Sequence, residues 1–180
     1  MNMKTLQITL MASFLLLTVA CEPAVKKDAA KIKAAEDALF ADEKGFVDRE
    51  KALGLVDMYI NFANTYPDDT MAVENLFKAA EFCLNLGEGQ RAIELYDRVI
   101  TEYPDFRKVP ECYFLTGYVY ENYLGDLENA RIIYAAFIEK YPDNEFADDA
   151  EISIQNLGKT PEELIKQFEE QQAAAAPEEQ

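Results

Sequence analysis

Clusters of acidic side chains are the strongest candidates for chemistry in this sequence. Asp68-Asp69, Asp148-Asp149 with Glu151, and Glu162-Glu163 each place carboxylates within one helical turn, where they could hold a divalent cation or exchange protons. A calcium loop of the EF-hand type needs a glycine-bearing segment of about 12 residues with alternating oxygen ligands, and the sequence has none. Two of the clusters follow a Tyr-Pro-Asp tripeptide, where acids cap the next helix and complement its dipole. We therefore predict structural capping, with no metal and no cofactor.

Nucleophilic and general-base chemistry has little support in this sequence. It contains no histidine, which removes the commonest general base, the Ser-His and Cys-His pairs, and the commonest metal ligand. We expect no catalytic site and no enzymatic activity.

The composition points to a folded, acidic, helical chain. Of its 180 residues 49% are apolar and 12% aromatic, which is enough to fill a core. Seven glycines and few alternating apolar runs favour an all-α fold. The net charge of −17 repels phosphate backbones and anionic membrane surfaces, so we expect no nucleic-acid partner. It suits a protein partner that carries basic residues.

The N-terminus has the pattern of an export signal. Lys4 precedes an apolar stretch from Leu6 to Val19, too short for a convincing membrane span but suited to a secretory signal at residues 1–20. The segment ending in Ala20-Cys21 resembles the lipobox of bacterial lipoproteins, although Thr18 stands where that family most often has leucine. The resemblance implies lipidation of Cys21 and a membrane-tethered protein facing the periplasm, at the outer membrane. The alternative is an ordinary signal peptide cut after Ala20, which leaves a thiol at Cys21.

A repeat organises the rest of the chain. Tyr-Pro-Asp occurs at residues 66–68, 103–105 and 141–143, and proline cannot continue a helix. Each copy closes a segment with helical apolar spacing, which predicts stacked helix pairs. The best two units run from Val73 to Phe106 and from Pro110 to Asn144, with turns at Gly87 and Gly125. The second unit carries one extra residue ahead of Gly125.

Small and aromatic residues recur at matching places in these two units. Ala80 and Gly117 take the small position of the first helix, and Ala92 and Ala130 take that of the second. Tyr96 or Tyr134 follows four residues later. This pattern resembles the tetratricopeptide repeat, whose helix–turn–helix units have about 34 residues. The resemblance implies a right-handed superhelix of about three helix pairs with a short C-terminal capping helix. The alternative is a generic helical bundle.

The flanking segments complete the predicted organisation. Thr160-Pro161-Glu162-Glu163 is a capping box with proline at the first helical position, which starts a last short helix through Phe168. A first helix of a further unit is expected from Phe146 to Leu157. The expected segments are the signal at 1–20, a polar tether at 21–30, repeats at 31–69, 70–106 and 107–144, a partial repeat at 145–170, and a disordered or frayed tail at 171–180.

The other two cysteines, Cys83 and Cys112, fall on successive first helices in this register. An axial offset of roughly 12 Å, at about 1.5 Å per residue, is more than a disulfide spans. We expect two buried, reduced thiols.

The resemblance also implies a concave groove lined by the first helices. Aromatic rings flanked by acids there would suit a peptide or helical segment with apolar anchors and Lys or Arg. The alternative for Phe77 and Phe114 is packing between neighbouring helices. The groove positions are Glu74, Phe77, Glu81, Leu84, Asn85, Glu111, Phe114, Tyr118, Glu121 and Asn122.

The sequence therefore predicts a scaffold that binds segments of other cell-envelope proteins. The type of repeat in this chain, together with the lipobox, resembles the lipoprotein subunit of the outer-membrane β-barrel assembly machinery and the repeat proteins associated with Tol–Pal. The alternatives are a self-associating structural protein of the envelope, and an accessory subunit or small-ligand carrier.

Overall fold

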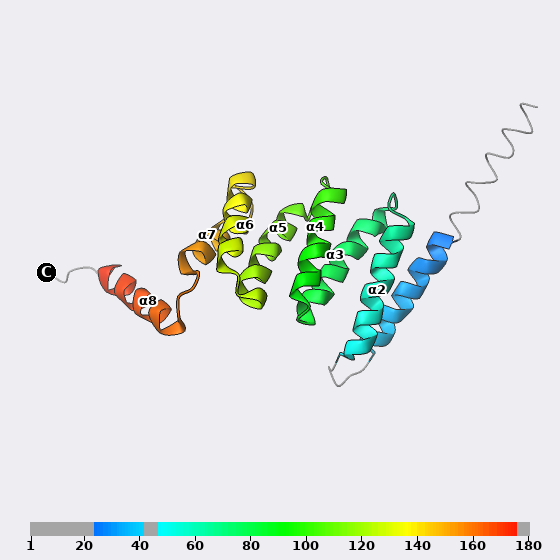
Figure 1. Cartoon of the computed structure of the whole chain (residues 1–180), viewed down its shortest axis with the longest axis horizontal. Coiled ribbons are helices and arrows are strands. Elements are labelled where there is room, and N and C mark those ends of the chain that lie inside the picture. Colours follow the sequence, from blue (N-terminus) through cyan, green and yellow to red (C-terminus); the bar gives the residue numbers. More distant parts are fainter. Residues whose placement is uncertain (1–23, 42–46, 176–180) are drawn as a thin grey trace, which may run out of the picture. The chain divides into compact units, whose positions relative to one another are not determined.

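The computed structural model describes residues 24–41 and 47–175, and all regular elements in these ranges are helical (Figure 1). The signal segment, Cys21 and the last five residues lie outside the described part of the chain. A helix at residues 24–39 comes first. The remaining elements are α2 (Arg49–Thr65), α3 (Thr70–Asn85), α4 (Gly89–Glu102), α5 (Val109–Val119), the π turn η1 (Tyr120–Leu124), α6 (Leu127–Lys140), α7 (Ala147–Asn156) and α8 (Pro161–Ala175).

Two compact units divide the chain, one ending at Leu86 and the other beginning at Gly87. In the first unit α2 packs on α3, and hydrogen bonds from Tyr59 and Tyr66 attach the helix at residues 24–39 to α2. In the second unit α5 packs on α4 and α6, and α6 packs on α7. The all-α repeat fold expected from the sequence is confirmed.

The three Tyr-Pro-Asp copies share one geometry. Tyr66, Tyr103 and Tyr141 each end a helix, and each backbone N–H donates to the carbonyl four residues earlier. Their φ angles lie between −130° and −134°, which is outside the helical range, and the following proline then prevents the helix from continuing. Each tyrosine carbonyl accepts a hydrogen bond from the residue three positions on, which closes the turn to the next helix.

The acidic clusters lie at helix starts, as predicted. The carboxylate of Asp69 accepts the backbone N–H of Met71 at the start of α3, 2.8 Å away. Asp148 and Asp149 lie in the first turn of α7, and Glu162 and Glu163 in that of α8. The predicted capping box is present. The backbone N–H of Thr160 donates to the carboxylate of Glu163, and the backbone N–H of Glu163 donates to the hydroxyl of Thr160.

Small residues lie where helices approach closely. Ala92 and Ala130 are fully buried in the second unit. A methyl group placed on Gly117 of α5 would stand 2.7 Å from the ring of Tyr134 on α6, so this contact requires the absence of a side chain. The close approach predicted at Gly117 is confirmed.

The extra residue ahead of Gly125 is accommodated by the π turn η1. The N–H groups of Gly125 and Asp126 both donate to the carbonyl of Tyr120, the latter over 2.8 Å. Gly125 has a φ of 65°, a left-handed conformation that glycine adopts without a steric penalty. Gly89, at the start of α4, lies close to Val119 and Tyr123 beside this turn.

Both ends of the repeat region differ from the prediction. Residues 24–30 are helical, although the sequence assigned them to a polar tether; alanine and lysine favour a helix, and Asp28 accepts a hydrogen bond from Tyr66. The last helix continues to Ala175 rather than ending near Phe168, because the alanine run extends it. Residues 171–175 thus belong to α8, which agrees with the helical alternative expected for this segment and not with a disordered tail.

Candidate protein-binding surface

The predicted groove residues of the first unit differ widely in exposure. Phe77 on α3 is only 1% exposed, so its ring packs in the core and is not presented to a partner. Glu74, Glu81 and Leu84 are half-buried, and Asn85 is exposed. Glu81 lines a pocket of this unit.

That pocket, the α3 pocket, has a volume of about 370 Å³. Its apolar side includes Phe82, whose ring centre lies 6.2 Å from that of Phe40 and 6.0 Å from that of Tyr59. Phe40 is 62% exposed and Val47 is 48% exposed, so two large apolar side chains of this pocket reach solvent. The pocket is lined by Phe40, Val47, Glu81, Phe82, Asn85 and Leu86.

In the second unit the predicted groove residues on α5 and η1 form mostly internal contacts. Phe114 stacks on Phe146 with ring centres 5.0 Å apart and planes 15° apart, and it also touches Tyr134 and Phe137. It is therefore part of the aromatic cluster that joins α5, α6 and α7. Tyr118 is 38% exposed and touches Tyr123, so it is the ring of the predicted set that reaches solvent.

The polar members of this second set are bonded within the unit. Glu121 accepts a hydrogen bond from the hydroxyl of Tyr134 over 2.9 Å. The amide of Asn122 donates to the carbonyl of Tyr118 over 3.1 Å. Glu111 forms an ion pair with Lys108 at 3.7 Å. These contacts leave the second set with one exposed ring, one acid paired with a cation and one acid bonded to a hydroxyl.

A tyrosine–glutamate bond recurs in both units. In the first, Glu36 accepts hydrogen bonds from the hydroxyl of Tyr59 (2.5 Å) and the ammonium of Lys78 (2.7 Å). Partial burial pushes the pKa of Glu36 upward, but the bonds from Lys78 and Tyr59 outweigh it and leave the pKa below its usual value. Burial, followed by the nearby glutamate, raises the pKa of both Tyr59 and Tyr134. Each of these hydrogen bonds holds a buried tyrosine ring and a glutamate carboxylate in a fixed position relative to each other.

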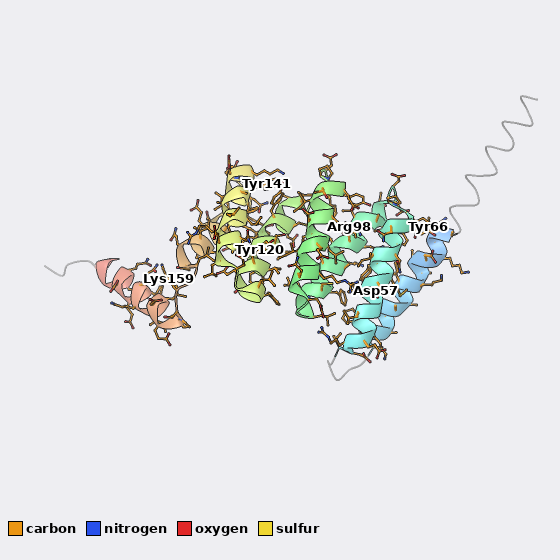
Figure 2. All side chains as sticks on the ribbon, in the orientation of Figure 1. Asp57, Tyr66, Arg98, Tyr120, Tyr141 and Lys159 are labelled. Carbon is orange, nitrogen blue, oxygen red and sulfur yellow. The ribbon has the colours of Figure 1, made fainter. Side chains whose placement is uncertain are left out.

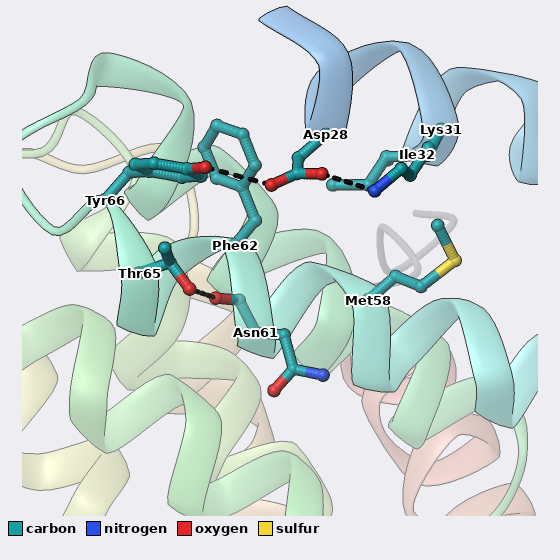
Figure 3. A pocket seen from close by; sticks show the side chains of 8 residues that line it. All are labelled: Asp28, Lys31, Ile32, Met58, Asn61, Phe62, Thr65 and Tyr66. Atoms are coloured by element: carbon teal, nitrogen blue, oxygen red, sulfur yellow. Dashed lines mark hydrogen bonds and ion pairs between the residues drawn. The ribbon is translucent and has the colours of Figure 1, made fainter. Parts of the chain in front are cut away.

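A second pocket in the first unit lies between the helix at residues 24–39 and α2 (Figure 3). Figure 3 shows Asp28 between the hydroxyl of Tyr66 (2.9 Å) and the ammonium of Lys31 (2.7 Å). The bond from Lys31, helped by that from Tyr66, lowers the pKa of Asp28. The pocket measures about 220 Å³, below the roughly 300 Å³ of ordinary small-molecule sites. Its one acid is already paired, so it offers little to a charged ligand.

A third pocket, the α4–α6 pocket, lies within the second unit and measures about 310 Å³. It shares no residue with the predicted groove. Tyr120, labelled in Figure 2, contributes to it from the first position of η1. Its lining comes from α4, α5, η1 and α6: Ile93, Glu94, Asp97, Ile100, Tyr113, Thr116, Tyr120 and Ile133.

Both cysteines of the described part are buried, reduced thiols, as expected. Residues 24–41 and 47–175 contain no group of three or more His, Cys, Asp or Glu placed to hold a metal ion. Within the same ranges, no helix has both the length and the apolar character required to cross a membrane.

A comparison with known protein families finds the same two repeats that the sequence pattern predicted. Residues 74–105 and 111–144 each match the tetratricopeptide repeat. These two segments are similar to the tetratricopeptide repeat, and together they span less than half of the chain. Repeats of this kind stack into extended protein-binding surfaces, so the matched segments support an interaction scaffold. No curated protein matches the chain.

Sequence reasoning missed the apolar side of the α3 pocket. Phe82 directly follows Glu81, and Phe40 directly follows the alanine-rich first helix, so both were visible as large apolar residues near charged ones. What the sequence did not provide was their proximity, since residues 40 and 82 are far apart in the chain and meet only through packing.

Proposed function

We propose that this protein is an exported, lipid-anchored tetratricopeptide repeat scaffold that binds segments of other envelope proteins at the outer membrane. The α3 pocket carries the proposal, because it combines exposed apolar side chains, Phe40 and Val47, with the carboxylate of Glu81 and the amide of Asn85. A partner with an apolar anchor and a neighbouring Lys or Arg matches this chemistry. The chain's net charge of −17 favours the same class of partner.

The binding test compares two charge reversals. Glu81→Lys places a cation beside the α3 pocket, whereas Glu139→Lys makes the same change at an exposed position of α6. Tagged protein is crosslinked in cells, and the co-purifying proteins are identified for the parent and both variants. We expect Glu81→Lys to lose most of a partner that Glu139→Lys retains. Equal recovery from the two variants would refute the assignment to this pocket.

The anchor is tested at Cys21. Acylation at two or three positions would hold the protein firmly on a membrane, whereas a single chain binds only marginally. We expect Cys21→Ser to move the protein from the membrane fraction to a soluble or unprocessed pool. A Cys21→Ser protein that is still cleaved and still fractionates with membranes would show that lipid is not the anchor.

Self-association is the second candidate, and two exposed residues of α8 favour it. Ile165 and Phe168 are 60% and 61% exposed, a large apolar exposure for neighbouring turns of one helix. Crosslinking separates the two functions, because a scaffold gives products with other proteins and self-assembly gives multiples of the mass of the processed chain.

A further inference from the structure

We propose that the α4–α6 pocket is a second docking site, specific for a protein segment that presents an aliphatic side chain next to a Lys or Arg. This inference rests on the proposed function as a scaffold, and it adds a site and a partner chemistry on different residues. All the lining residues belong to the second unit, so the site is complete within that unit.

The floor and walls of the pocket are apolar. Ile93 and Ile100 lie two turns apart on α4, and Ile133 contributes from α6. Thr116 is buried, and its hydroxyl already donates to the carbonyl of Cys112 over 2.8 Å. A volume of about 310 Å³ lies at the low end of the roughly 300–1,000 Å³ found for small-molecule sites. The pocket therefore suits one or two side chains of a protein segment rather than a cofactor.

The rim of the pocket is acidic and uncompensated. Glu94 and Asp97 are exposed and lie one turn apart on α4. Within residues 24–41 and 47–175, neither carboxylate has a hydrogen bond or ion-pair partner. Arg98 lies one turn after Glu94 and forms an ion pair with Glu102 at 2.7 Å. A cation brought by a partner would meet two unneutralised acids next to an apolar cavity.

One further cation limits where the partner's charge can lie. Lys140 donates to the hydroxyl of Tyr113 over 3.2 Å and stands over its ring, 4.7 Å from the centre. The bond to Tyr113, and then a contact with Tyr141, raises the pKa of Lys140, so the group remains charged. The partner's cation is therefore directed to the α4 side, towards Glu94 and Asp97, and its apolar side chain to the space between Ile93, Ile100 and Ile133.

The site is separate from the predicted groove even where both use α5. The pocket takes Tyr113, Thr116 and Tyr120, which recur at intervals of three and four residues and so lie on one side of the helix. The predicted groove positions on the same segment include Phe114, Tyr118 and Glu121. Phe114 directly follows Tyr113, so this second row of side chains is rotated by about 100° around the helix axis from the first. The α4–α6 pocket is therefore a different surface of the second unit from the predicted groove.

The test uses purified full-length protein and an array of synthetic peptides. Each peptide carries one leucine and one arginine in an alanine–serine background, with the two placed at every spacing within two helical turns. We expect at least one spacing to bind. Affinity should fall about tenfold or more for Glu94→Lys/Asp97→Lys, because like charges across an interface are strongly unfavourable. It should stay unchanged for the control Glu139→Lys/Glu151→Lys, which makes the same change at exposed positions of α6 and α7.

A milder variant tests the apolar half of the site. Ile100→Ala, shown by circular dichroism to be folded, should weaken the leucine–arginine peptide several-fold and leave a peptide with alanine in place of leucine unaffected. Peptides that bind both charge variants equally, or no binding at any spacing, would overturn this site. Peptide binding lost on Glu81→Lys instead would overturn this site while supporting the α3 pocket. A dimer of the parent that Glu94→Lys/Asp97→Lys disperses would also overturn it, by making a second copy the occupant.

Discussion

Among single residues, two tyrosines combine a buried ring with a hydroxyl that donates a hydrogen bond. Tyr59 and Tyr134 occupy the same repeat position in the two units, and each hydroxyl donates to a glutamate on the preceding helical segment. The ring supplies apolar burial and the hydroxyl fixes the distance between two helices. Gly117 complements this arrangement, because it lets the ring of Tyr134 lie directly on the backbone of α5.

Gly117→Ala should be strongly destabilising. The added methyl group would stand 2.7 Å from the ring of Tyr134, and we expect a loss of about 1–3 kcal/mol in the free energy of unfolding. Gly54→Ala is the matched control, since Gly54 lies on the exposed side of α2 with no atom within 4 Å of the new methyl group. It should raise stability by about 0.5–1 kcal/mol through helix propensity. Urea unfolding of both variants measures the difference, and equal stabilities would contradict the close approach.

The buried tyrosines predict a loss of stability at alkaline pH. Because the folded pKa of Tyr59 and of Tyr134 is raised, their contribution is complete below the unfolded pKa of about 10 and declines as pH rises above it. Tyr59→Phe/Tyr134→Phe should therefore show a shallower fall in unfolding free energy between about pH 9 and about pH 11. Tyr123→Phe, at an exposed ring, should follow the parent. A parallel decline in all three proteins would argue against the bonded, buried hydroxyls.

Among helices and turns, several helix ends are recognisable from local residues in the sequence. The Tyr-Pro-Asp copies end α2, α4 and α6, and the capping box starts α8. The sequence located these ends because each depends on residues a few positions apart. The helix at residues 24–30 was not predicted, since its stability comes partly from the distant Tyr66. The burial of Phe77 was one of two alternatives that the sequence left open, because a groove position inferred from a repeat gives the direction of a side chain and not its depth.

The turn after η1 should depend on glycine. Gly125 has a φ of 65°, and a methyl group added to it would meet no atom within 4 Å, so strain in the backbone, not crowding, opposes a side chain there. We expect Gly125→Ala to cost about 1 kcal/mol or more, and Gly125→Asn to cost less, because asparagine tolerates this conformation. Thermal denaturation of the two variants tests the order. A Gly125→Ala protein at least as stable as Gly125→Asn would contradict it.

For the whole chain, excess negative charge is the dominant electrostatic feature. The net charge is −17, and several ion pairs join residues within one turn of an exposed helix, where each contributes little. Repulsion between acids should therefore outweigh attraction between pairs.

Sodium chloride should accordingly stabilise this protein. Raising the ionic strength from about 0.01 M to about 0.15 M shortens the screening length from about 30 Å to about 8 Å, which weakens repulsion across each unit. We expect the Tm to rise over this range, as measured by calorimetry. A variant in which several exposed acids are replaced by glutamine should show a smaller rise. A Tm that falls with salt would mean that ion pairs dominate.

The π turn has a consequence for how such a chain can change in length. One residue inserted in an ordinary helix rotates everything after it by about 100°, which would turn the buried side of α6 towards solvent. In η1 the surplus residue is absorbed in a single wider turn, and Ala130 and Tyr134 still face the core. The repeat thus keeps its phase across an insertion, so this site is where single-residue additions and deletions can occur without repacking the helices on either side.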